Sequence, residues 1–199
     1  MNILAISPHT DDAELGAGGT LARYVEDGHT VKVVAFSTGN PVDGASTPEM
    51  AGAMAALGVK QWDVYGFRCR YYHDQRAGVL EELERLRGRF APDLVFCPSL
   101  NDTHQDHVAV TCEVLRAFRY SSILAYELLR NTVVPFEPTH YVKLTETHIE
   151  AKIAALQCYE SQHHRPYFDE RVTRGLAVVR GMQVGTKYAE AFEVLRWVE

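Results

Sequence analysis

The sequence predicts a single α/β domain in which helices cover both faces of a mainly parallel β-sheet. Short apolar segments of strand length alternate with longer segments whose apolar residues recur at helical spacing. Such alternation, joined by right-handed crossovers, builds three-layer sandwiches around a parallel sheet. The chain has 199 residues, of which 46% are hydrophobic, enough for one substantial core. We therefore expect one domain over residues 1–199.

Two structural signals define the elements of the N-terminal part. Gly28 follows a helical segment and suits a left-handed C-cap. Thr47, Pro48 and Glu49 supply an N-cap, a proline and an acidic residue for the first turn of a second helix. The elements expected here are strand 2–7, helix 16–27, strand 30–36, loop 37–46, helix 47–57 and strand 59–67.

The same alternation continues to the C-terminus. Val79, Leu83 and Leu86 recur at helical spacing, and Pro92 stops that helix. Thr145 can cap a later helix. The elements expected here are helix 75–90, strand 94–97, helix 106–118, strands 122–126 and 140–144, a helix after Thr145, helix 169–180 and strand 191–198.

Charge and cysteine content argue against several classes of protein. The formal net charge of −6 leaves no basic surface of the kind that binds nucleic acid. The four cysteines lie far apart without a CxxC pair, which fits reduced thiols better than a structural zinc site. The first apolar run is too short for a signal peptide, and no segment is long enough to span a membrane. We expect a cytoplasmic protein that binds neither nucleic acid nor a membrane.

Two polar clusters follow two of the predicted strands. His9, Asp11 and Asp12 come after strand 2–7, and the segment 102–107 comes after strand 94–97. Side chains at strand ends of open α/β sheets face the crevice where ligands bind. Each histidine or aspartate alone would more often be a loop residue or a helix cap. Two such clusters at two strand ends favour one shared metal site.

The residue types suit a hydrolytic zinc site with three protein ligands. His9 and Asp12 can point at one ion from a tight turn, and either His104 or His107 can be the third ligand. Asp11 is then a candidate base for a metal-activated water. The remaining histidine can stabilise an oxyanion or protonate a leaving amine.

A glycine-rich segment, 16–20, follows the first cluster. It lacks the spacing of dinucleotide-binding and phosphate-binding loops. Close packing of a helix on the sheet is the role that we expect for it.

The two clusters resemble a known family. Residues 9–20 are similar to the His-Pro-Asp-Asp signature of the LmbE-like, or PIG-L, N-acetylglucosaminyl deacetylase family, and residues 104–107 match its second motif, His-x-Asp-His. The resemblance implies zinc-dependent hydrolysis of an N-acyl amine, usually an N-acetyl group on a sugar, on a Rossmann-like sheet. It also implies that homo-oligomers are possible. The roles that it implies are one Zn²⁺ held by His9, Asp12 and His107, Asp11 as general base, His104 as general acid or oxyanion partner, and Asp106 in support of His104.

The chain departs from the family pattern at two positions. Thr10 replaces the usual proline, so the turn loses a fixed φ angle. Ser46 stands where many relatives carry a substrate-contacting arginine. Arg68, Arg70 or Arg76 can substitute for that arginine, and the sequence does not choose among them.

Other substrate contacts are expected along the crevice. Glu127, Arg130 and Asn131 follow strand 122–126 and would lie at its mouth, or else in a solvated loop. Arg180 and Tyr188 belong to a C-terminal third that resembles a family branch linked to surface-polysaccharide and sugar-antibiotic pathways. An ordinary helix-end charge and a strand aromatic are the alternative interpretations of those two.

We expect a zinc hydrolase that removes an acyl group, an acetyl first of all, from an amino sugar, a nucleotide sugar or a related amine. One alternative keeps the metal but hydrolyses the amide of a thiol conjugate. Another alternative is a sugar- or nucleotide-binding protein without activity. An intact set of ligands with a spare carboxylate argues against that last alternative.

Overall fold

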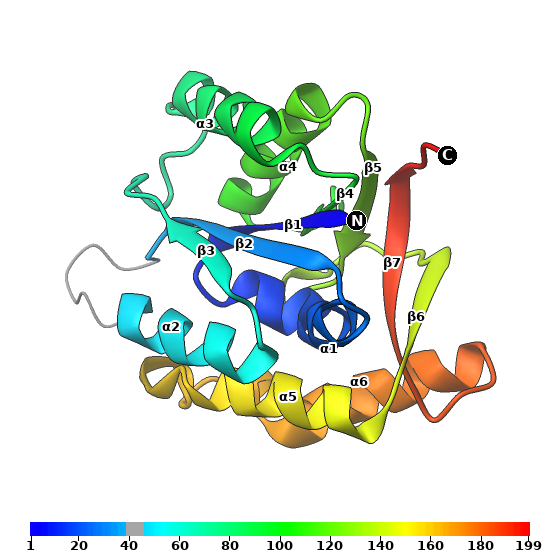
Figure 1. Ribbon diagram of the computed structural model, residues 1–199. Helices are drawn as coiled ribbons and strands as arrows, with labels where there is room; N and C mark the ends of the chain where they lie inside the picture. Colours follow the sequence, from blue (N-terminus) through cyan, green and yellow to red (C-terminus); the bar gives the residue numbers. More distant parts are fainter. Residues whose placement is uncertain (39–45) are drawn as a thin grey trace.

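The computed structural model describes residues 1–38 and 46–199, and the side chain of Ser46 is not described. Most of the loop expected over 37–46, and the side chain at the position of the family arginine, therefore lie outside the described residues. The described chain folds as a sheet with helices on both faces (Figure 1).

The sheet has seven strands in the order β3-β2-β1-β4-β5-β7-β6. The pairings from β3 through β5 are parallel, whereas β7 is antiparallel to both of its neighbours. The strands are β1 Asn2–His9, β2 Thr30–Ser37, β3 Gln61–Val64, β4 Leu94–Pro98, β5 Ser122–Tyr126, β6 His140–Leu144 and β7 Tyr188–Arg196.

The sheet is thus mixed: it is parallel from β3 through β5, as expected for a mainly parallel sheet, but the two pairings of β7 are antiparallel. Two helices, α5 (Glu146–Gln157) and α6 (Glu170–Gln183), lie between β6 and β7. A single crossover helix returns the chain to the end where the previous strand began, which gives a parallel strand. A second helix carries the chain to the opposite end, so β7 runs the other way.

Two layers of helices cover the sheet (Figure 1). On one side lie α1 (Asp12–Glu26), α2 (Ser46–Leu57), α5 and α6, and on the other lie α3 (Arg76–Phe90) and α4 (Gln105–Ala117). Strand β1 serves both cores, because alternate side chains of a strand point to opposite faces. Ile3 and Ala5 pack in the core that holds α1, whereas Leu4 and Ile6 pack in the core that holds α3 and α4.

The start of α1 differs from the expectation. The helix begins at Asp12 instead of Gly16, and β1 extends to His9. The first polar cluster therefore lies at a strand end and in the first turn of a helix, not in a free loop. The glycine-rich segment is inside the helix, where a Cβ at Gly16 would overlap the ring of Tyr126 and one at Gly18 would lie 3.0 Å from Cγ of Lys152. The prediction of close packing is confirmed.

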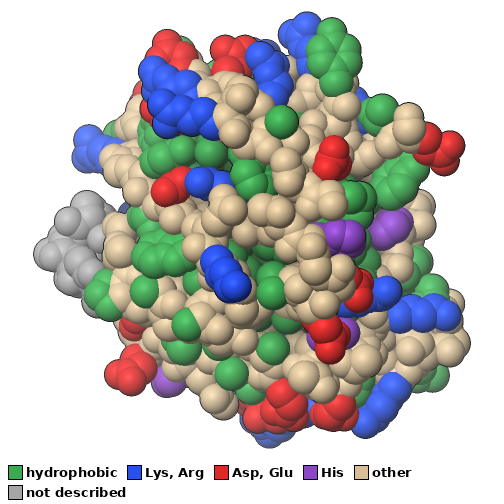
Figure 2. All heavy atoms as spheres, in the orientation of Figure 1, with side chains coloured by type: hydrophobic (Ala, Val, Ile, Leu, Met, Phe, Trp, Pro, Cys, Tyr) green, Lys and Arg blue, Asp and Glu red, His purple; other side chains and the backbone are tan. Residues whose placement is uncertain are grey.

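The surface agrees with the acidic composition. On the face drawn in Figure 2, basic and acidic side chains are interspersed, and no continuous basic surface covers that face. Within residues 1–38 and 46–199, no helix is both long and apolar enough to cross a membrane.

Candidate active site

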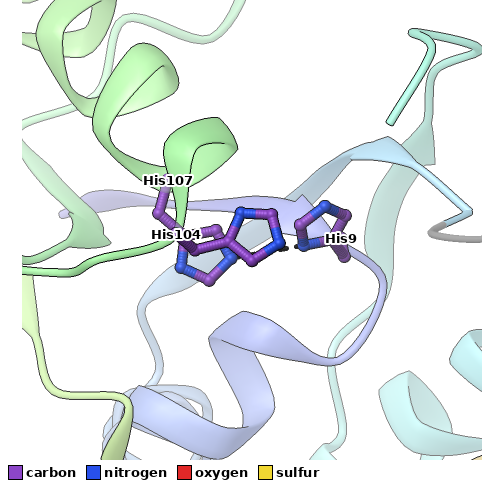
Figure 3. Close-up of side chains that lie close together, drawn as sticks. All are labelled: His9, His104 and His107. Atoms are coloured by element: carbon purple, nitrogen blue, oxygen red, sulfur yellow. Dashed lines mark hydrogen bonds between the residues drawn. The ribbon is translucent and has the colours of Figure 1, made fainter. Parts of the chain in front are cut away.

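The two polar clusters meet where β1 and β4 end side by side. These strands are parallel neighbours, so their carboxyl ends reach the same edge of the sheet. His9 ends β1, and Asp12 begins α1. His104 is the N-cap residue of α4, and His107 lies in its first turn. Figure 3 shows the three histidine rings close together, with centroids 4.5–5.2 Å apart.

Three side-chain atoms form a nearly equilateral triangle at this edge. His9 Nδ1 lies 3.1 Å from Asp12 Oδ2, and His107 Nε2 lies 3.2 Å from that oxygen. The two ring nitrogens are 3.2 Å apart. A tetrahedral zinc ion bonded to nitrogen and oxygen at about 2.0–2.1 Å separates its ligand atoms by about 3.3 Å. The donor set and its spacing therefore fit a zinc ion.

The outer nitrogens of the same two histidines contact carboxylates. Asp102 Oδ2 lies 2.7 Å from His107 Nδ1, and Asp106 Oδ2 lies 3.2 Å from His9 Nε2. Carboxylates in this position fix the tautomer and the orientation of metal-binding imidazoles. The sequence places Asp106 in support of His104, but its carboxylate contacts His9 instead. Asp102, which belongs to the second polar cluster and has a helix cap as its alternative role, contacts His107.

His104 occupies a different environment. Its ring stacks on that of His107, and its Nδ1 accepts a hydrogen bond from the backbone N–H of Asp106. Burial, together with the charges of His107 and His9, lowers the pKa of His104 to about 4. Ligand atoms of His9, His104 and His107 all lie within 4.8 Å of one another, so His104 is close enough to join the same site.

Burial and neighbouring charges shift the pKa values of the two adjacent aspartates, Asp11 and Asp12, in opposite directions. Burial and the neighbouring Asp12 raise the pKa of Asp11 to about 6, against the opposing charges of His9 and Arg165. Burial also disfavours the charged form of Asp12, but the charges of His107 and His9 hold its pKa well below the usual range. The pair thus separates into a carboxylate held by histidines and a carboxyl group that accepts a proton more readily.

A buried tyrosine supports the turn between β1 and α1. The Tyr159 hydroxyl lies 2.5 Å from Glu14 Oε1 and also hydrogen-bonds the carbonyl oxygen of Thr10. Burial raises the pKa of Glu14 to about 8. A tertiary contact from the C-terminal part of the chain thus holds the backbone at Thr10, where the family pattern has proline.

Comparison with known proteins identifies the family. The sequence matches the family of GlcNAc-PI de-N-acetylases (PIG-L) over residues 4–118, more than half of the chain. The chain belongs to this family. The resemblance seen in the sequence is thereby confirmed.

Two curated relatives and a solved structure agree with this family assignment. The uncharacterized deacetylase YaiS of Escherichia coli (strain K12) is 33% identical over 168 residues, which cover 80% of this chain and 90% of YaiS. Diacetylchitobiose deacetylase of Thermococcus kodakarensis is 25% identical over 222 residues, covering 94% of this chain and 80% of that protein. The conserved protein TT1542 of Thermus thermophilus has a similar structure, with a TM-score of 0.83 at 26% identity and coverage of 100% and 96%.

In this PIG-L chain, a cavity of about 590 Å³ opens over the histidines and Asp11. Four of the six substrate-contact candidates line it: Glu127, Arg130, Asn131 and Arg180. The other two candidates, Arg68 and Tyr188, are not among the described residues that line the cavity. Arg68 lies over the ring of Tyr71, 3.8 Å from its centroid, and the Tyr188 hydroxyl hydrogen-bonds Glu146. Of the other two arginines considered as replacements for the family arginine, Arg70 lines the cavity, whereas Arg76 pairs with Glu113.

Cys69 is a cavity residue that the sequence did not single out. Its Sγ lies 3.4 Å from both His9 Nε2 and Asp106 Oδ2, and the three side chains form a second group with ligand atoms within 4.8 Å. The next residue, Arg70, has a φ of 71° and donates its backbone N–H to Asp106 Oδ2 at 2.7 Å. A lone cysteine in the loop after β3 carries no spacing signal, so only the fold brings it to the site.

Proposed function

We propose that this chain is a zinc-dependent deacetylase that removes an N-acetyl group from an amino sugar or a sugar derivative. The observation that carries the proposal is the triangle of His9 Nδ1, Asp12 Oδ2 and His107 Nε2, with Asp11 in the same cavity. Membership of the PIG-L family supports it, as do a curated relative that is a deacetylase of diacetylchitobiose and a closer one named as a deacetylase.

His9, Asp12 and His107 would hold the ion in this proposal. Bound there, zinc supplies Lewis-acid polarisation of a water molecule and of the acyl carbonyl. Asp11 accepts a proton from that water, whose oxygen bonds to the acyl carbon. The proton then passes to the amide nitrogen as the C–N bond breaks, which yields acetate and a free amine.

We assign to His104 the stabilisation of the oxyanion that develops on the acyl carbonyl oxygen. Because its Nδ1 accepts the N–H of Asp106, the ring proton of the neutral form resides on Nε2. A neutral imidazole with this tautomer is a hydrogen-bond donor to the negative charge that develops on the carbonyl oxygen. Among the two roles that the sequence leaves open for His104, this one suits its hydrogen bonding better than that of proton donor to the amine.

Asp11→Asn tests the base assignment. The variant keeps the three ligands, so we expect near-stoichiometric zinc by elemental analysis together with a loss of acetate release of about 10²-fold or more. His107→Ala is the contrasting variant, and it should lose zinc itself. Turnover of Asp11→Asn at the wild-type rate would remove Asp11 from the mechanism. A wild-type protein that purifies without zinc and takes none up would support a binding protein instead.

A panel of substrates tests which class of amide the protein hydrolyses. N-acetylated sugars, nucleotide sugars and the N-acyl amides of thiol conjugates are each incubated with the zinc-loaded protein, and the released carboxylate is measured. We expect release from the sugars. Hydrolysis of the thiol conjugates alone would replace sugar deacetylation by the amidase alternative.

A further inference from the structure

Three buried tyrosine hydroxyls donate hydrogen bonds to backbone carbonyl oxygens at alternate positions of the segment 6–10. The pairs are Tyr126 with Ile6, Tyr72 with Pro8, and Tyr159 with Thr10. Each of these tyrosines is at most 1% exposed. A buried carbonyl oxygen without a partner is unfavourable, so the three hydroxyls satisfy groups that water does not reach.

The three tyrosines come from separate parts of the fold. Tyr126 ends β5, Tyr72 lies in the loop between β3 and α3, and Tyr159 follows α5. The segment that they contact has left one neighbouring strand, because the pairing of β1 with β4 ends at Ala5. Side chains from distant elements therefore hold the end of β1 where its ladder to β4 stops.

Two of the three carbonyl groups directly precede residues of the candidate site. His9 follows Pro8, and Asp11 follows Thr10. The carbonyl group of one residue and the N–H group of the next lie in one rigid peptide plane. A hydrogen bond that fixes the carbonyl of Pro8 therefore fixes the backbone orientation at His9. The bond to Thr10 does the same for Asp11.

The Tyr159 hydroxyl is directed at the backbone by a second contact. Glu14 Oε1 lies 2.5 Å from the same hydroxyl oxygen. A hydroxyl group has one proton, and a carbonyl oxygen can only accept, so the proton that Tyr159 gives to Thr10 is not shared with Glu14. The proton of the second contact therefore belongs to the carboxyl group of Glu14, in keeping with the raised pKa of that group.

We propose that Tyr72 and Tyr159 are positioning residues of the reaction: Tyr72 holds His9 in place as a metal ligand, and Tyr159 holds Asp11 in place as the base. This inference rests on the proposed deacetylase function. Both hydroxyl protons are donated to the backbone, so each tyrosine acts through the residue that follows its acceptor and not on the substrate.

The first test needs no turnover. Cobalt(II) is bound in place of zinc to wild type, Tyr72→Phe, Tyr159→Phe and the control Tyr141→Phe, and its visible absorption spectrum is recorded. The spectrum reports the arrangement of the ligands around the ion. Tyr141 also donates to a backbone carbonyl, that of Pro138, but it lies on the edge strand β6. We expect altered spectra in the first two variants and the wild-type spectrum in the control.

The second test measures acetate release by the zinc-loaded proteins. We expect kcat to fall about tenfold or more in Tyr72→Phe and Tyr159→Phe with KM within about twofold of wild type, because a misplaced catalytic group slows the chemical step more than it weakens binding. A merely structural role would lower Tm and leave kcat of the folded protein unchanged. Thermal unfolding identifies the folded variants, and either variant alone decides the result if the other does not fold.

The outcomes separate the two proposals. Wild-type cobalt spectra and wild-type kcat values in the folded variants would overturn the positioning role and leave deacetylation standing. Equal changes in Tyr141→Phe would also overturn it, because the effect would then be general to buried hydroxyls. Altered cobalt spectra in Tyr72→Phe and Tyr159→Phe alone, in a protein that hydrolyses no acylated sugar, would overturn the deacetylase assignment and leave the positioning of the metal ligands in place.

Discussion

Each of the two histidines in the proposed metal site has both of its ring nitrogens in contact with a carboxylate. His107 directs Nε2 to Asp12 and Nδ1 to Asp102, whereas His9 directs Nδ1 to Asp12 and Nε2 to Asp106. An imidazole held at its outer nitrogen by a carboxylate cannot rotate freely, and its inner nitrogen keeps the lone pair that a metal needs. In the proposed metal site, Asp102 and Asp106 would therefore be positioning residues for the ligands His107 and His9.

Asp102→Asn should weaken zinc binding about 10- to 100-fold, because the neutral amide no longer stabilises the imidazole as a ligand. The substitution keeps the size of the side chain and an oxygen that can accept the backbone N–H of His104. Zinc affinity is measured by competition with a chromogenic chelator. The control is Asp74→Asn, on an exposed side chain. Equal zinc affinity of Asp102→Asn and wild type would show that the carboxylate does not position the ligand.

The residues of the site differ in how far sequence could predict them. His9, Asp11 and Asp12 are neighbours in the chain, so a strand followed by a helix brings them together whatever the rest of the fold does. The partner of Asp106 could not be predicted, since its carboxylate meets His9 across 97 positions. Cys69 could not be predicted either, because its loop belongs to neither cluster.

At the scale of elements, α1 is fitted closely to the sheet beneath it. Its second turn carries Gly16 directly over the ring of Tyr126, and the Tyr126 hydroxyl donates to the carbonyl oxygen of Ile6 in β1. The ring is fully buried and cannot move aside without breaking that hydrogen bond. The first turn of the same helix holds Asp12, so this packing also sets the place of a proposed metal ligand.

Gly16→Ala should destabilise the protein by about 1–3 kcal/mol, because the added methyl group overlaps the Tyr126 ring. Gly175→Ala is the matched control. It adds the same group to helix α6 where no atom lies within 4 Å, and it should stabilise the protein by about 0.5–1 kcal/mol. Urea unfolding measures both. If the two variants have equal stability, close packing at Gly16 is not what requires a glycine there.

The elements were predictable where a local signal exists. Strands 122–126 and 140–144 have the expected bounds: the first is a compact apolar run, and the second contains Tyr141, Val142 and Leu144. The start of α1 was not predictable from its glycines, because the acidic residues before Gly16 occupy the first helical turn. The direction of β7 depends on two consecutive helices packing on one side of the sheet, which is a property of the tertiary structure.

At the scale of the whole molecule, one buried ion pair joins three elements. Lys152 of α5 pairs with Glu190 of β7 at 2.6 Å and donates to the carbonyl oxygen of Leu15 in α1 at 2.7 Å. Glu190 in turn accepts the backbone N–H groups of Gly19 and Thr20. Both charged side chains are only 7% exposed, so each depends on the other for compensation.

Lys152→Met should cost about 3–5 kcal/mol of unfolding free energy, because it keeps most of the volume but leaves the Glu190 carboxylate buried without its cation. Lys60→Met, on an exposed lysine, should change the stability by less than about 0.5 kcal/mol. Denaturant unfolding provides the measurement. A loss of similar size in both variants would mean that the charge pair does not hold these elements together.

The proposed metal site also joins distant parts of the molecule, since His9 and Asp12 come from β1 and α1 while His107 comes from α4. A ligand that binds only the folded state stabilises it, by about 2.7 kcal/mol at a concentration 100 times its Kd. For a chain of this size that corresponds to a rise in Tm of about 5–10 °C. We expect zinc to produce this rise over protein treated with a chelator, and His107→Ala to abolish it.

The control for this measurement is His73→Ala, on an exposed histidine, which should keep the full rise in Tm. Each variant removes one histidine, so zinc binding to the cysteines and histidines of the unfolded chain is nearly the same in both. The difference in Tm between the two variants therefore reports the folded site. An equal rise in His107→Ala would mean that zinc stabilises the protein from another place.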